Sequence, residues 1–264
     1  MLTIRPQHFQ LLLITYFGVF AVVHAQSAAP EGGANNEVVD LIVGNELTVK
    51  GKAKIDSILE NRLVNFDDQM MVNLVEMYPE TAVAEYLIEV ADDSNRHAVT
   101  RQRAMAWLAY TKDDRAEDFL RSYVERLTNL EKKDLDFVEF NLLHAAIMSQ
   151  GSIGSNSSID YLLQISSKDF WERKTISCNW LNMDAEGIET HMRKAALWGI
   201  VRSETSRAVA LFPSDSNPMP GLLSEEEAAS LARTARLRAQ KVYVDPEAQR
   251  EASQQSEPSN IQGE

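Results

Sequence analysis

The chain has 264 residues, and its 39 acidic and 26 basic side chains give a formal net charge of −13 at pH 7. Phosphate backbones and anionic lipids repel such a protein, which argues against binding to nucleic acid or to a membrane surface. Cationic or neutral partners fit this charge better, although solubility alone also explains it.

Residues 1–25 have the pattern of a secretory signal peptide. Arg5 supplies a positive charge, an apolar stretch follows from Leu11 to Val23, and Val23 and Ala25 are the small residues that a signal peptidase reads. The apolar stretch of about 13 residues is short for a bilayer, which takes roughly 20 residues to span. We therefore expect an exported protein with no membrane insertion after cleavage, and an uncleaved anchor is the alternative.

Cysteine usage bears on the compartment. Cys178 is the only cysteine, so an intramolecular disulfide is excluded. A core of about 200 residues is large enough to be stable without one. The absence of a disulfide framework favours a bacterial periplasm over a eukaryotic extracellular space. For Cys178 itself a buried, inert thiol is expected, and pairing between chains is the alternative.

A helical domain is expected over residues 37–243, between two polar flanks. Residues 26–36 predict a flexible leader and residues 244–264 a disordered tail, because both have little apolar content. Residues 37–49 alternate loosely between apolar and polar side chains. This alternation fits either a short strand pair or an irregular cap.

Helical periodicity continues through four pairs of helices. A first amphipathic helix is marked by Ile55, Ile58, Leu59 and Leu63. The pairs, each with a short polar break between two helices, span Met71–Val90, Ala104–Val124, Leu142–Ile165 and Ala195–Phe212. Recurrence at intervals of roughly 33 to 53 residues is typical of an α-solenoid, in which each unit buries its apolar face against its neighbours. The predicted fold class is therefore all-α, with about four helical hairpins.

Polar residues mark the expected helix boundaries. Asp113 and Asp114 are alternative N-caps in the second pair, and Asp134 is the expected N-cap of the third pair. A long turn is expected over Gln150–Ser158, which is rich in Gly, Ser and Asn. The first helix of the fourth pair is expected to start near Asp184.

A terminal helix is predicted after the fourth pair. Ser224 and Glu227 have the spacing of a capping box, in which each side chain accepts a backbone N–H from the other residue. The acidic residues at its start and the basic residues near its end match the helix dipole. Such a helix would close the exposed end of a solenoid.

In the second and fourth pairs a basic residue precedes an Ala-rich helix, and an acidic residue lies in the following turn. The residues are RQRAMAWLA from Arg101 with Asp113 and Phe119, and MRKAALWGI from Met192 with Glu204 and Ala208. Over roughly residues 65–212 the chain thus resembles HEAT repeats, especially the short bacterial HEAT-like type. The resemblance implies an α-solenoid that acts as a scaffold, and it carries over no catalytic residue.

Motifs for catalysis and metal binding are missing from the sequence. It contains no HExxH, no GxSxG and no phosphate-binding loop. Glu189 and His191 are two residues apart, so on a helix they point to different faces. We therefore expect a protein that is not an enzyme and has no metal and no cofactor.

The candidate partner-binding residues lie in two places. Phe170, Trp171 and Trp180 belong to the irregular stretch Ser166–Asn182, and aromatic side chains often dominate interfaces. His144 and His191 lie on predicted helices that would line a groove. The favoured alternatives to direct binding are packing of the loop for the aromatic residues, a core position for His144, and a structural or solvent-exposed role for His191.

The first hypothesis is an exported, non-catalytic helical scaffold that binds a protein or peptide partner. The second is an exported hydrolase or lyase that uses His191, Glu189 or Cys178 in a pocket under residues 166–182. The third is a structural module of an envelope complex whose tails make the contacts. The folded structure can distinguish the second hypothesis from the others, because only an enzyme needs these side chains to converge in one cleft.

Overall fold

The computed structural model describes residues 41–43, 46–60, 82–111, 113–129 and 133–240. The predicted signal peptide, leader, tail and first helix of the first pair lie outside the described residues. Within them the chain is mostly helical, which confirms the all-α class. The chain divides into two units, Met1–Ser203 and Glu204–Glu264, which are described separately.

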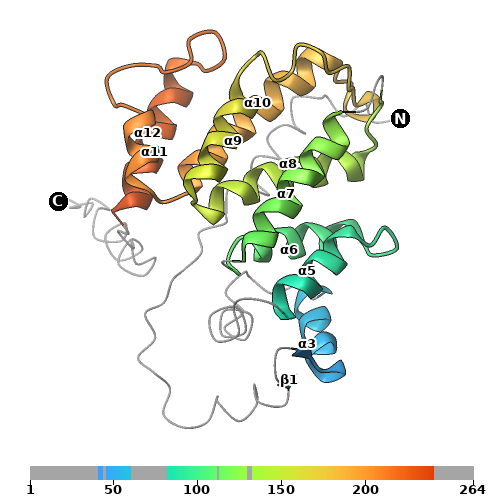
Figure 1. Cartoon of the computed structure of the whole chain (residues 1–264). Helices are drawn as coiled ribbons and strands as arrows, with labels where there is room; N and C mark the ends of the chain where they lie inside the picture. Colours follow the sequence, from blue (N-terminus) through green and yellow to red (C-terminus); the bar gives the residue numbers. More distant parts are fainter. Residues whose placement is uncertain (1–40, 44–45, 61–81, 112, 130–132, 241–264) are drawn as a thin grey trace, which may run out of the picture. The chain divides into compact units, whose positions relative to one another are not determined.

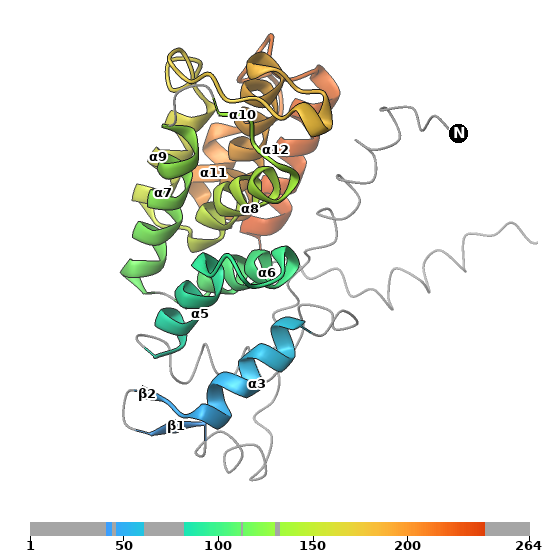
Figure 2. The ribbon, with the colours of Figure 1, turned by 90° about the vertical axis from the view of Figure 1, so that its right-hand side faces the viewer.

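Unit 1 opens with a small strand pair and a helix. The elements are β1 (Ile42–Val43), β2 (Glu46–Leu47) and α3 (Val49–Glu60). The strands pair antiparallel, with Ile42 opposite Leu47, so the strand-pair interpretation of this region is confirmed. Helix α3 buries Ile55, Ile58 and Leu59, as predicted, and lies beside α6 (Figure 2).

The remaining helices of unit 1 lie within the predicted helical ranges, but they pack in a different pairing. They are α5 (Ala82–Asp92), α6 (Ala98–Leu108), α7 (Asp114–Thr128), α8 (Phe137–Ile153), α9 (Asn156–Ser166) and α10 (Ala185–Arg202), with a short 3-10 helix η1 (Asn179–Leu181). Consecutive helices pack as α5 with α6, α7 with α8 and α9 with α10. Helices α6 and α7 occupy the range of the second predicted pair but hardly pack on each other, because α6 packs on α5 and α8 while α7 packs on α8. Helices α8 and α9 are the third predicted pair, and they contact each other. Helix α10 is the first helix of the fourth pair.

Helix α8 is the centre of unit 1. Every residue from Phe140 to Gly151 is buried, because α8 contacts α6, α7, α9 and α10. Figure 1 shows α6, α8 and α10 following one another, and α5 packs against α6 and α7. A helix that is covered on all sides needs an apolar or small residue at nearly every position, and LLHAAIM supplies this.

Two glycines allow α8 and α10 to cross closely. A Cβ atom added to Gly151 would lie 1.8 Å from the carbonyl oxygen of Gly199 and 2.6 Å from its Cα. Only hydrogen fits in this space, so Gly151 is required for the crossing. The predicted long turn over Gln150–Ser158 was therefore wrong at Gly151, which lies inside α8. Helix α8 continues to Ile153 and ends at Gly154, whose φ of 74° is left-handed.

The N-caps refine the predicted boundaries. Asp113, rather than Asp114, caps α7 by accepting the backbone N–H of Arg115. The predicted cap at Asp134 was wrong, because Asp136 caps α8 and forms a capping box with Glu139. The start at Asp184 is confirmed, since its side chain accepts the N–H of Gly187.

Unit 2 contains α11 (Ser206–Leu211) and α12 (Glu225–Ala239), which pack against each other. The predicted capping box is confirmed, with Ser224 and Glu227 each accepting a backbone N–H from the other. Ala228, Leu231, Ala232 and Ala235 form the buried face of α12. The predicted fourth pair is thus divided between the two units.

Candidate functional site

Phe137 and Trp180 form an exposed aromatic pair on unit 1. Phe137 is the first residue of α8, and Trp180 lies in η1. Their ring centroids are 4.4 Å apart with planes tilted by 47°, although Phe137 is 41% and Trp180 58% exposed. Single exposed apolar residues are common on proteins, whereas tryptophan is enriched among the residues that dominate the energetics of interfaces. We call these two residues the aromatic pair.

Asp134 fixes the loop that carries Trp180. Its Oδ1 accepts hydrogen bonds from the backbone N–H of Asn179 (2.8 Å) and the hydroxyl of Ser177 (3.2 Å), and its Oδ2 accepts from Nδ2 of Asn179 (2.9 Å). The backbone adds two hydrogen bonds, from Leu135 N–H to Ser177 O and from Ser177 N–H to Lys133 O. The residue expected as a helix cap therefore holds the two chain segments of the pair together.

A tight turn completes the loop around Trp180. Cys178 and Met183 exchange backbone hydrogen bonds of 2.8 and 3.1 Å, and Asn182 adopts a left-handed φ of 55°. Asparagine tolerates this conformation better than most residues. Cys178 is fully buried below the turn, and burial raises the pKa of its thiol. These contacts fix the backbone of the loop that carries Trp180.

The surroundings of the aromatic pair are acidic. Residues 133–139 and 177–187 carry five carboxylates and one amine, Lys133, for a net charge of −4. Lys133 forms an ion pair with Glu139. The side chains of Asp136 and Asp184 accept only neutral backbone N–H groups in their capping roles, so their negative charge is not neutralised there.

Trp171 and Phe170 lie apart from this surface. Trp171 is only 3% exposed, and its indole N–H donates to the carbonyl oxygen of Ile165 at 2.7 Å. Phe170 is packed between the rings of Trp171 and Tyr161, with the amine of Lys174 4.3 Å from its centroid. Loop packing accounts for both residues, so neither is part of the aromatic pair.

His144 and His191 meet between α8 and α10. Their ring centroids are 5.3 Å apart, and Phe140 lies 5.1 Å from His191. Burial lowers the pKa of His144 to about 3, with further lowering by the charges of His191 and Arg202. Burial and Lys194 lower the pKa of His191 to about 4, and its Nε2 is buried without a hydrogen-bond partner. Both imidazoles are therefore neutral at pH 7.

The side chains of the enzyme hypothesis do not form an activated nucleophile in the described residues. Glu189 is ion-paired with Arg193 at 2.9 Å, one helical turn away on α10. The raised pKa of Cys178 disfavours a thiolate at neutral pH. His191 packs on His144 and Phe140. A nucleophile, a base and an orienting group within hydrogen-bond reach are what such chemistry requires.

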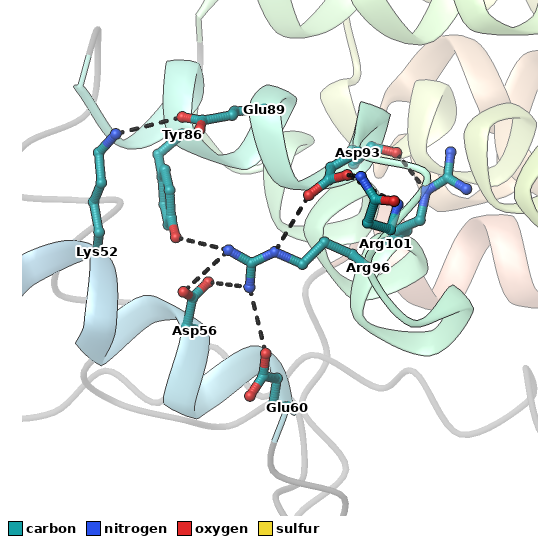
Figure 3. Close-up of polar contacts among 10 residues, drawn as sticks. Lys52, Asp56, Glu60, Tyr86, Glu89, Asp93, Arg96 and Arg101 are labelled. Carbon is teal, nitrogen blue, oxygen red and sulfur yellow. Dashed lines mark hydrogen bonds and ion pairs between the residues drawn. The ribbon is translucent and has the colours of Figure 1, made fainter.

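A second polar cluster links α3 to α5 and the start of α6 (Figure 3). The guanidinium of Arg96 contacts both oxygens of Asp56, at 2.9 and 3.2 Å, and also contacts Glu60, Asp93 and the hydroxyl of Tyr86. Burial, followed by the hydrogen bond with Asp56, raises the pKa of Tyr86 to about 12. A phenol with a raised pKa stays protonated at neutral pH, so Tyr86 serves this cluster as a hydrogen-bonding group rather than as a base.

Replacing Arg96 should loosen α3. Arg96→Met keeps most of the side-chain length but leaves Asp56 without its bidentate partner. We expect the free energy of unfolding to fall by about 1–2 kcal/mol. Hydrogen exchange should become faster for α3 amides and stay unchanged for α8. Lys52→Met, which removes the exposed contact with Glu89, is the matched control with little expected effect. Equal exchange rates of the α3 amides in the two variants would contradict a structural role for Arg96.

Metal binding and membrane spanning are both limited by the arrangement of the described residues. No group of three or more His, Cys, Asp or Glu side chains in the described ranges is arranged to hold a metal ion. None of the helices among these residues is long and apolar enough to cross a membrane.

Of the five predicted site residues, only Trp180 lies on the exposed aromatic surface, and its partner Phe137 was missed. Phe137 follows the N-cap Asp136 and stands one turn before the buried Phe140. An aromatic residue at the first position of a helix, outside the predicted buried stripe, was the signal that could have identified it. Comparison of the chain with protein-family models, curated proteins and solved structures finds no match, so its function must be inferred from this geometry.

Proposed function

We propose that the chain is an exported, non-catalytic helical-repeat protein that binds a protein or peptide partner through the aromatic pair. The observation that carries this proposal is the contact of Phe137 with Trp180 at 4.4 Å while both rings remain exposed. Hydrogen bonds of Asp134 hold the two segments in place, as expected for a preorganised anchor. Export, with a periplasmic location first and an extracellular one second, is proposed from residues 1–25.

The helix contacts support a HEAT-like α-solenoid as the scaffold. Helix α8 touches α6 on one side and α10 on another, while α5 contacts α7 and α9 contacts α8 and α10. Neighbour-to-neighbour packing of this kind is what serial repeats require. We propose this architecture for unit 1, with the aromatic pair at the start of α8.

Removal of the Trp180 ring should abolish most partner binding. Peptides that bind the chain would be selected from a random display library, and their affinity measured by fluorescence anisotropy. Trp180→Ala should raise the dissociation constant of the peptide by about 30-fold or more, because an aromatic anchor contributes about 2 kcal/mol or more to the binding free energy. Because the side chain is 58% exposed, the variant should keep the wild-type circular dichroism spectrum and thermal midpoint within about 2 °C.

Leu237→Ala is the matched control. Leu237 is 45% exposed and lies on α12 in unit 2, so its removal deletes a comparable apolar surface outside the proposed site. Its affinity should equal that of the wild type. The proposal is wrong if selection yields no saturable binder, or if Trp180→Ala and Leu237→Ala bind equally well.

A further inference from the structure

We infer that the partner segment is basic, and that an arginine or lysine side chain of this segment packs on the rings of Phe137 and Trp180. This inference rests on the proposed function and specifies the chemistry of its partner. It joins two independent properties of the same surface, an exposed pair of aromatic rings and an excess of carboxylates. Either property alone would fit many partners, but together they select a cation with an apolar stem.

The charge around the aromatic pair is suited to a basic segment. Asp136 is the residue before Phe137, and Asp184 follows Met183, whose backbone is paired with Cys178 next to the Trp180 turn. The donors to Asp134 are a hydroxyl, a backbone N–H and a side-chain amide, so its hydrogen bonds leave its charge in place. A partner that brings positive charge here is attracted, whereas an anionic partner is repelled.

The aromatic faces explain why a cationic side chain is preferred to a simple cation. The face of an indole or phenyl ring is electron-rich, and a guanidinium or ammonium stacked on it gains cation–π attraction while its methylene stem covers apolar surface. The chain already uses this contact within unit 1. The guanidinium carbon of Arg121 lies 4.9 Å from the ring of Tyr161, and the amine of Lys174 lies 4.3 Å from that of Phe170.

The test uses two labelled peptides that differ in one property. Both have the same Gly/Ser sequence with a central leucine, and they carry either two arginines or two citrullines, which have the same shape without the charge. Fluorescence anisotropy is measured with the full chain at 50 and 250 mM NaCl. The arginine peptide should bind at least about 10-fold more tightly, and only its affinity should fall with salt.

Variants of the chain separate the ring contribution from the charge contribution. Trp180→Ala should reduce the preference for arginine over citrulline to the part that the carboxylates contribute. The double variant Asp136→Asn/Asp184→Asn should weaken the arginine peptide about 3- to 10-fold and leave the citrulline peptide unchanged. Asparagine is an equally good N-cap, so α8 and α10 keep their first turns. Glu226→Gln, an exposed carboxylate on α12, is the charge control and should have no effect.

The outcomes distinguish this inference from the proposed function. Equal affinity for both peptides, or no binding of the arginine peptide up to 1 mM, overturns the basic partner. The proposed function then still stands if a library-selected peptide loses affinity in Trp180→Ala. If Trp180→Ala instead turns a dimer into a monomer in sedimentation, the surface is a contact between two copies and the inference is wrong.

Discussion

Acidification from pH 7 to pH 5 is expected to lower the free energy of unfolding of unit 1 by about 4 kcal/mol. Burial holds the pKa of His144 at about 3 and that of His191 at about 4, whereas an unfolded histidine titrates near 6.5. Between these values the unfolded state binds more protons than the folded state. The contribution of the two neutral histidines to the free energy of unfolding is therefore fully present above pH 6.5. It is lost as the pH falls, by about 2 kcal/mol for each histidine at pH 5.

Urea denaturation at several pH values measures this loss. The double variant His144→Leu/His191→Leu should have nearly the same stability at pH 7 and pH 5, because it has no buried imidazole to protonate. His97→Asn is the control: His97 is exposed and caps α6, and asparagine can also cap a helix. This control should keep the full wild-type pH dependence. A wild-type stability that is equal at pH 7 and pH 5 would rule out the buried neutral pair.

Gly151→Ala is expected to lower the free energy of unfolding by about 3 kcal/mol. The new Cβ would lie 1.8 Å from the carbonyl oxygen of Gly199, and both atoms belong to rigid helix backbones. The helices α8 and α10 would have to separate, with loss of packing along their whole contact. This loss outweighs the gain of up to about 1 kcal/mol that alanine normally brings inside a helix. The thermal midpoint should fall by about 6–12 °C.

Gly199→Ala tests whether the effect is specific to the crossing point. A Cβ atom on Gly199 meets its nearest neighbours, the carbonyl oxygen of Ile147 and Cδ1 of Leu162, at 3.2 Å. Small shifts can relieve this contact, and the helix preference of alanine offsets part of the cost. We expect a change of about 1 kcal/mol or less. If thermal unfolding shows Gly151→Ala to be no worse than Gly199→Ala, the close crossing is not present in solution.

The helices could be predicted from local patterns because their signals are local. The apolar spacing of Ile55, Ile58 and Leu59, and the capping pairs at Asp184 and Ser224, each depend on residues within one or two turns. Burial of His144 within an apolar helix was favoured for the same reason, and the structure places it at 9% exposure. Single-sequence reasoning is strongest where the interacting residues are neighbours in the chain.

The errors arose where tertiary contacts override local preference. Gly151 reads as a turn residue, but it continues a helix because the neighbouring backbone of Gly199 leaves no room for a side chain. Asp134 reads as an N-cap, but the loop at Ser177 and Asn179 uses its carboxylate. The partners of Gly151 and Asp134 lie more than 40 positions away in the sequence, so local patterns do not contain them. For the same reason Trp171 and Trp180 could not be told apart, although one is buried and the other exposed.

The anchoring of the Trp180 loop has a consequence for the order of folding. The hydrogen bond between Ser177 and Asp134 joins residues separated by 43 positions. Closing a loop of this length costs conformational entropy that only the packing of α8 and α9 between these residues can offset. During synthesis Phe137 leaves the ribosome before Trp180, so the aromatic pair can form only after α9 and the following loop have been made.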